Sequence, residues 1–340
     1  MEGKQFQLEW VSSYTPDTVR NYYEERRIES GKGFPSIYGE YKKDMGAVEI
    51  QGKYAKSPEG SGFVAEALVF MCIDKGALGS GITARGTHRY DDIRHGADLV
   101  IETRADQLRE PIVSAVDVTI NQKDSKAPAK GSFENRNRSE KIGFEYKLER
   151  IKSHVDYLAT MPDDRAIQLS AWIQQGGLLR ERTSLNEENF EDAEKLMSLK
   201  YYRNPEHGQD PDKPRFVVGG PQLVISVDSH FVNKVFSTKG DEQKKTVDNL
   251  SALLQAEVPL AIGMLKEYVE SVAKTSREKG LGTNLFFASY RAACLAWEET
   301  FLNDQYQFRV ERAVKTCQGD KDLLAQLKYF QNTLQKSFGI

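Results

Sequence analysis

Two apolar segments near the middle of the chain are each interrupted by an aspartate. The segments read ADLVIET and PIVSAVDVTI, and they contain Asp98 and Asp117. Both are rich in valine and isoleucine, which favour strands, and the polar stretch TRADQLRE between them is long enough for a hairpin loop. We therefore predict two paired strands that place two carboxylates close together.

The faces of these strands follow from the alternation of side chains. Asp98 shares a face with Val100 and Glu102, and Asp117 shares a face with Thr119. The opposite face of the second strand is mostly apolar and suits packing under helices. Its residues are Ile112, Ser114, Val116, Val118 and Ile120.

Helical patterns lie on both sides of the strand pair. SGFVAEALVFMCIDKG predicts a helix that stops at Gly76. After the strands, apolar residues at spacings of four and three mark one helical face, which we expect to pack on the sheet. These residues are Phe144, Leu148, Ile151, Val155 and Leu158.

The rest of the chain completes the predicted organisation. PDDRAIQLSAWIQQGGLL is expected to be helical up to its glycines, NEENFEDAEKLMSLKYYRN helical, and KPRFVVGGPQLVISVD one or two strands. The C-terminal hundred residues have helical periodicity throughout. We therefore divide the chain into an N-terminal extension of mixed structure (1–60), an α/β core (61–232) and a helical C-terminal region (240–340).

Composition narrows the class of protein. The chain has 340 residues, and its apolar and charged fractions are those of a globular protein. Its formal net charge is −3, so a phosphate-binding surface would have to be a local basic patch. Its three cysteines are widely spaced, which favours reduced thiols, and the longest apolar run, 63–73, is too short to span a bilayer. We expect a soluble cytoplasmic protein without a membrane partner.

The predicted carboxylate pair suggests a metal site. Two carboxylates held close together repel each other unless a proton or a cation lies between them. Mg²⁺, or Mn²⁺ in its place, is bound through oxygen and needs only one or two carboxylates beside water and substrate phosphate. Asp98 and Asp117 are therefore candidate ligands.

Two further residues are candidates for the same site. Glu66 lies in a helix whose residues three, four and seven positions away are apolar or glycine, so we expect it to point into a covered cavity. Extending the stripe at Phe144 back by three positions reaches Lys141, which places a cation near Asp117, with Lys147 behind it.

These residues and elements resemble the PD-(D/E)XK nuclease superfamily over residues 61–229. The core of that family is a helix, a three-strand meander, a helix and a further strand, and its acids would map to Glu66, Asp98 and Asp117. The resemblance implies an α+β, restriction endonuclease-like fold with a mixed sheet flanked by helices. It also implies a metal-dependent nuclease in which Glu66, Asp98 and Asp117 bind the metal.

The chain departs from the family pattern at two points. The first motif reads GAD without the proline, and the second reads DVT, with Thr119 where the family has a lysine. Some members of the family supply this lysine from a neighbouring helix. Lys141 is the candidate for that role.

The predicted partner is nucleic acid, DNA or RNA. Residues 121–152 include nine basic and five acidic residues, and such a segment beside a metal site can contact phosphates. The residues assigned to nucleic-acid binding are Lys123, Lys126, Lys130, Arg136 and Arg138. A charge run of this kind also occurs as an ordinary solvated surface.

The same residues allow other interpretations. Asp98 and Asp117 can cap strand ends or pair with Arg85 or Arg94, Glu66 can be an exposed helix position, and Lys141 a solvated lysine. The protein as a whole can be a non-catalytic descendant of the fold that binds nucleic acid or a protein partner. The apolar stretch NLFFASYRAACLAW suggests homo-oligomer assembly through the C-terminal helices.

Overall fold

The computed structural model describes most of the chain outside the N-terminal region and several loops. It covers residues 14–26, 61–79, 81–88, 91–92, 95–104, 111–121, 144–180, 182–202, 215–302 and 304–339. The protein is a mixed α+β structure with a four-stranded sheet, a two-stranded sheet and a helical C-terminal region, as the sequence predicts.

The larger sheet has the strand order β1-β2-β3-β6. β1 pairs with β2 and β2 with β3 in antiparallel fashion, whereas β6 runs parallel to β3. The predicted strand pair is confirmed as β2 and β3, whereas the sequence pattern does not predict β1. The bounds are β1 Ile82–Gly86, β2 Leu99–Thr103, β3 Ile112–Asn121 and β6 Gln222–Asp228.

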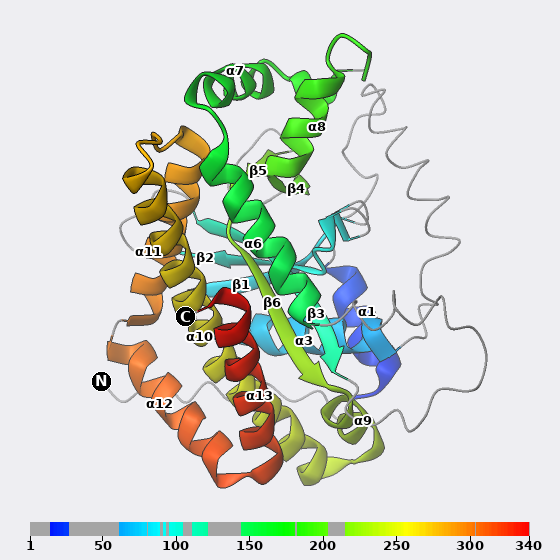
Figure 1. Cartoon of the computed structure of the whole chain (residues 1–340). Coiled ribbons are helices and arrows are strands. Elements are labelled where there is room, and N and C mark those ends of the chain that lie inside the picture. The colour runs from blue at the N-terminus through cyan, green and yellow to red at the C-terminus, as the bar shows by residue number, and fades with distance from the viewer. Residues whose placement is uncertain are drawn as a thin grey trace, which may run out of the picture.

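Helices cover both faces of this sheet (Figure 1). α3 (Ser61–Asp74) contacts β1 and β3, and its side chains are apolar around most of the helix, as a helix buried in a core requires. α6 (Phe144–Thr160) packs against β6 and β3, and the residues of its predicted apolar stripe, from Phe144 to Leu158, are buried. The two predicted helices beside the strand pair are confirmed.

A smaller sheet lies against the face of β2 and β3 that carries Val100 and Ala115. Leu199 and Tyr202 of β4 join these two residues in a separate apolar cluster. The elements of this region are α7 (Asp163–Gln174), the 3₁₀ helix η1 (Gly177–Leu179), α8 (Glu187–Leu196), β4 (Met197–Tyr202) and β5 (Arg215–Val218).

One helix prediction is wrong beyond Leu196. MSLKYY forms β4, because its backbone pairs with β5 and because Leu199 and Tyr202 pack on the larger sheet. These contacts come from distant parts of the chain, and they override the local helical pattern.

The C-terminal region is helical, as predicted, and it shares one core with the sheet. Trp297 donates its indole N–H to Oγ1 of Thr103 on β2 (2.6 Å), and Gln326 donates from Nε2 to the carbonyl oxygen of Ser226 on β6 (2.9 Å). The helices are α9 (Ser229–Ser237), α10 (Gly240–Glu278), α11 (Leu285–Leu302), α12 (Asp304–Gly319) and α13 (Lys321–Phe338).

The apolar residues that suggested homo-oligomer assembly are mostly buried in the core of the protein itself. Phe287, Tyr290, Cys294 and Trp297 of α11 are at most 1% exposed. They therefore give no support to a homo-oligomer. No helix in the described part of the chain is long and apolar enough to cross a membrane, and the three cysteines are buried and free.

The described part of the N-terminal extension is a helix that packs on α3. α1 (Pro16–Glu25) begins with a capping box between Thr15 and Thr18, and proline occupies its first turn. Tyr23 packs edge-on against Phe63 and Phe70 of α3, with ring centroids 5.4 and 5.3 Å apart. The extension thus contributes to the core beside the predicted site.

Candidate functional site

Asp98 and Asp117 lie close together at the end of the β2–β3 pairing. The regular register ends with Leu99 opposite Val116, and Asp98 directly precedes β2. The backbone N–H of Asp98 also donates to Val116 O (2.9 Å), and Asp98 Oδ2 accepts from the N–H of Val118 (2.6 Å). Two carboxylates held this close repel each other, so the pair needs a proton or a cation.

Protonation can meet part of this need. Burial raises the pKa of Asp98 well above its ordinary value, and the negative charges of Glu66 and Asp117 raise it further. Burial also raises the pKa of Asp117, while Lys147 and a side-chain hydrogen bond with Asp98 oppose this increase. Burial and the neighbouring acids thus favour the protonated form of Asp98.

Glu66 is buried in α3 and acts on the same pair. Glu66 is only 9% exposed, so its interpretation as an exposed helix position is wrong. Its charge is the largest electrostatic contribution to the raised pKa of Asp98 after burial. The structure thus brings Glu66, Asp98 and Asp117 into one electrostatic group.

Lys147 supplies the cation of the site. Its ammonium group donates to Oδ1 of Asp117 and lies 3.4 Å from the carbonyl oxygen of Val118. Lys141, the predicted lysine, lies outside the described residues. Lys147 was also accessible to sequence reasoning, because it falls three positions after Phe144 and four before Ile151, inside the buried stripe.

The main chain of Asp98 is held from two other elements. Its carbonyl oxygen accepts hydrogen bonds from the hydroxyl group of Tyr23 on α1 (2.7 Å), from Thr87 Oγ1 (3.1 Å) and from Thr87 N (3.3 Å). Tyr23 and Thr87 are at most 1% exposed. The sequence pattern gave no signal for either contact, since α1 lies 75 positions from Asp98 and Thr87 follows a strand that the pattern did not predict.

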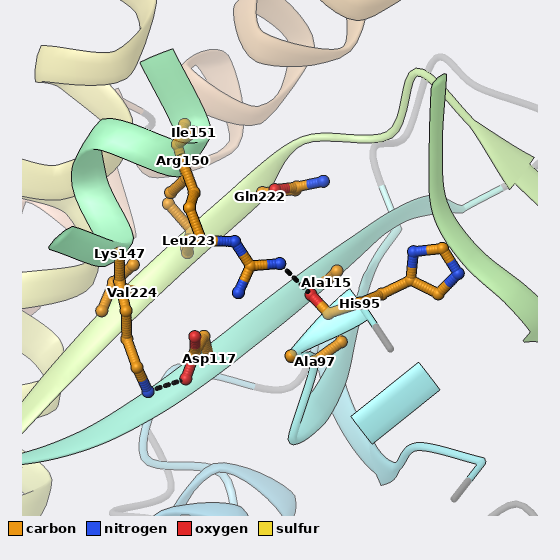
Figure 2. A pocket seen from close by; sticks show the side chains of 11 residues that line it. His95, Ala97, Ala115, Asp117, Lys147, Arg150, Ile151, Gln222, Leu223 and Val224 are labelled. Carbon is orange, nitrogen blue, oxygen red and sulfur yellow. Dashed lines mark hydrogen bonds and ion pairs between the residues drawn. The ribbon is translucent and has the colours of Figure 1, made fainter. Parts of the chain in front are cut away.

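A small, partly open cleft begins beside Asp117. Figure 2 shows Lys147 and Arg150 extending into it from α6, Lys147 towards Asp117 and Arg150 towards the His95 carbonyl group. Sequence reasoning did not single out Arg150 or Gln222 as site residues. The lining residues are His95, Gly96, Ala97, Ala115, Asp117, Lys147, Arg150, Ile151, Gln222, Leu223 and Val224.

Arg85, which the sequence offered as an ion-pair partner of Asp98 or Asp117, pairs with Glu102 instead. Its Nε donates to Oε1 of Glu102 (2.8 Å), which also accepts from the hydroxyl group of Tyr202 (2.7 Å). The Glu102 carboxylate is thus committed to β1 and the small sheet. Arg94, the other arginine proposed for the aspartates, lies outside the described residues.

Much of the basic segment lies outside the described residues. This holds for each residue that the sequence assigned to nucleic-acid binding, namely Lys123, Lys126, Lys130, Arg136 and Arg138. Lys147 and Arg150 are the basic members of residues 121–152 that line the cleft in the described part of the chain.

The described residues do not form a complete metal site by themselves. No group of three or more His, Cys, Asp or Glu side chains in the described ranges is arranged to hold a metal ion. Asp98 and Asp117 are two neighbouring carboxyl groups, and a magnesium ion that takes its other ligands from water and substrate phosphate needs only one or two. Glu66 is the third acid nearby.

Comparison of the chain with protein-family models, with curated proteins and with solved structures finds no significant match.

Proposed function

We propose that this protein is a metal-dependent nuclease that hydrolyses phosphodiester bonds of DNA or RNA. The observation that carries the proposal is the neighbouring pair Asp98 and Asp117, with the Lys147 ammonium group on Asp117 and an open cleft beside it. Such a set of charges is costly for stability, and perturbed carboxyl groups in a cleft are typical of catalytic sites.

The arrangement of elements supports the same proposal. α3, the antiparallel strands β1 to β3, α6 and the parallel strand β6 follow one another in the order that the resemblance to PD-(D/E)XK nucleases implies. β4, β5, α7 and α8 lie between α6 and β6 as an insertion. We therefore propose a restriction endonuclease-like core.

Each residue of the site has a proposed role. Asp98 and Asp117 would hold one Mg²⁺ or Mn²⁺, and Glu66 would orient a ligand of that ion. The ion, when bound, supplies activation of water and stabilisation of the leaving oxygen. Lys147 would take the place of the lysine that Thr119 replaces: it opposes the burial-driven rise in the pKa of Asp117, and it would present an N–H donor to the attacking water.

A second candidate function is binding without catalysis. The lack of a three-ligand group among the described residues favours it, as does the ion pair that engages Lys147 with Asp117. In this case the protein is an inactive nuclease-fold protein that binds nucleic acid or a protein partner. Both candidate functions use the cleft beside Asp117. They differ in whether Asp98 and Asp117 take part in catalysis.

Cleavage assays distinguish the two candidates. Single- and double-stranded DNA and RNA are incubated with Mg²⁺, Mn²⁺ or EDTA, using the wild type, Asp117→Asn and Lys147→Met. The matched control is Lys152→Met, because Lys152 lies on the same helix and also pairs with an acid, Glu149 (3.3 Å), but does not line the cleft.

The nuclease proposal predicts cleavage that EDTA and Asp117→Asn abolish, that Lys147→Met reduces about a hundredfold and that Lys152→Met leaves intact. It also predicts that Mg²⁺ raises the melting temperature of the wild type but not of Asp117→Asn. Absence of cleavage on every substrate, together with no effect of Mg²⁺ on melting, would leave the binding function instead.

A further inference from the structure

Arg150 extends the site away from the aspartate pair. It lies three positions after Lys147, so both side chains project from the same face of α6. Its Nη2 donates to the carbonyl oxygen of His95 (3.0 Å), yet the side chain is exposed. A guanidinium group carries five N–H donors, so this single bond orients Arg150 while leaving donors directed at the cleft.

The backbone opposite Arg150 is shaped to admit the guanidinium group. Gly96 has a φ of +62°, and a Cβ atom at this position would lie 2.8 Å from Arg150 Nη1. A larger residue would therefore have to displace the guanidinium group or the loop. The absence of a side chain at position 96 lets Arg150 lie flat against the main chain, where the His95 carbonyl group fixes it.

The charges along the cleft favour an anion at Arg150. Among the described lining residues, Lys147 and Arg150 are the permanent cations and Asp117 is the carboxylate. Lys147 is already paired with Asp117, whereas Arg150 contacts a neutral carbonyl group. Gln222, the first residue of β6, is partly buried, also lines the cleft (Figure 2) and adds amide donors.

We propose that Arg150 and Gln222 form a phosphate-binding subsite beside Asp117, occupied by a phosphate group of a nucleic acid. This inference rests on the proposed nuclease function and names the residues that seat its substrate. The planar guanidinium fork matches two phosphate oxygens, which a lysine cannot do with the same geometry. The bound phosphate lies next to the carboxylates that would carry out hydrolysis.

The test measures binding in EDTA, where cleavage does not interfere. Fluorescence anisotropy of fluorescein-labelled single- and double-stranded oligonucleotides is recorded over a range of salt concentrations for the wild type, Arg150→Gln, Arg150→Lys and Gln222→Leu. Arg180→Gln is the matched control, because Arg180 is also exposed and also donates from Nη2 to a backbone carbonyl oxygen, that of Gln175 (3.2 Å), outside the cleft.

We expect Arg150→Gln to weaken binding about ten- to a hundredfold and to reduce the slope of log affinity against log salt by about 1. Arg150→Lys should recover part of the affinity, Gln222→Leu should lose a smaller part, and Arg180→Gln should match the wild type. Equal affinity of the wild type, Arg150→Gln and Gln222→Leu, with circular dichroism showing folded variants, would overturn the subsite.

Further arms identify the source of the phosphate. Competition by inorganic phosphate, and preference for an oligonucleotide with a 5′-phosphate over one without it, would place a terminal phosphate monoester in the subsite. Equal binding of the two oligonucleotides would place a backbone phosphodiester there.

Cleavage assays on the same variants separate this inference from the nuclease proposal. If the wild type cleaves but Arg150→Gln does not weaken oligonucleotide binding, the subsite is refuted and the nuclease proposal stands. A wild type that binds through Arg150 but never cleaves refutes the nuclease proposal and retains the subsite.

Discussion

The hydroxyl group of Tyr23 donates to the main-chain carbonyl oxygen of Asp98 at 2.7 Å, across 75 positions of the chain. Asp98 is the aspartate whose own backbone N–H is bonded to β3, so its main chain is held from both sides. Through this contact, a helix that precedes the proposed nuclease core fixes the position of a candidate metal ligand.

Replacement of Tyr23 by phenylalanine tests this contact. We expect Tyr23→Phe to lose about 1 kcal/mol of unfolding free energy and to reduce metal-dependent cleavage, since among the described residues Thr87 alone then donates to the Asp98 carbonyl oxygen. The control is Tyr22→Phe, because Tyr22 donates to Asp74 at the end of α3, away from the aspartates. Urea unfolding and cleavage rates are compared; equal rates for Tyr23→Phe and wild type would assign Tyr23 to stability alone.

The aspartate pair should be more stable when one carboxyl group is made permanently neutral. Asp98→Asn keeps an oxygen that can accept from Val118 N and removes the repulsion from Asp117 and Glu66. We expect it to raise stability at neutral pH by up to about 1 kcal/mol while it abolishes metal-dependent cleavage. Thermal unfolding at neutral pH measures the first effect.

Asp192→Asn is the matched control, for which we expect the opposite change in stability. Arg165 and the hydroxyl group of Tyr157 bond the Asp192 carboxylate, and the hydrogen bond from Arg165 lowers the pKa of Asp192. This variant should lose stability at neutral pH and leave cleavage unchanged. A loss of stability in Asp98→Asn as large as that in Asp192→Asn would contradict the strained pair.

The close approach of Gly96 and Arg150 gives a separate test of the phosphate subsite. Gly96→Ala should cost about 1 kcal/mol for the left-handed backbone and should also push the guanidinium group off the His95 carbonyl oxygen. Gly176→Ala has a similar φ of +76° with no atom within 4 Å of its Cβ, so it carries the backbone cost alone. We expect only Gly96→Ala to weaken oligonucleotide binding, and equal binding by both variants would show that the contact is not needed.

Glu257 makes stability depend on pH far from the cleft. It is fully buried in α10, and burial raises its pKa well above 4.5, an increase that a side-chain hydrogen bond with Gln326 opposes only in part. A raised pKa means that its contribution to stability is complete below about 4.5 and is lost as the pH rises through the folded-state pKa.

Glu257→Gln should therefore stabilise the protein by about 1 to 3 kcal/mol at neutral pH and have little effect in acid. Its amide can donate to Oε1 of Gln326, an oxygen that accepts no hydrogen bond from the described residues. Glu270→Gln should instead destabilise at neutral pH, because Arg291 lowers the pKa of Glu270. Urea unfolding across the pH range measures both; a stability difference between Glu257→Gln and wild type that does not grow with pH would contradict the buried acid.

The elements beside the site could be predicted because local patterns specify them. The strand pair, the stripe of α6 and the apolar α3 each follow from residues within one short segment. β1 and β4 could not be predicted in the same way, because ITARG alternates buried and partly exposed positions without an apolar signal and MSLKYY is a strand only through its long-range contacts. The order of strands likewise comes from tertiary pairing.

The site was predictable to a similar extent. Period-two alternation places Asp98 and Asp117 together, and the apolar company of Glu66 indicates its burial. The choice between Lys141 and Lys147 depended on where the helix begins, which side-chain patterns define poorly. Tyr23, Arg150 and Gln222 come from three separate elements, and their roles emerge only once those elements are packed around the aspartates.

The parallel pairing of β3 with β6 has a consequence for how the chain folds as it is synthesised. β1, β2 and β3 are consecutive, so the aspartates can meet through short loops early in synthesis, whereas β6 follows only after α6, α7, α8 and the small sheet. Until β6 arrives, the outer edge of β3 is an unpaired strand, which is prone to pair with another chain. A chain that ends before Gln222 would therefore carry the carboxylate pair but lack one wall of the cleft, and it would aggregate through the edge that β6 normally covers.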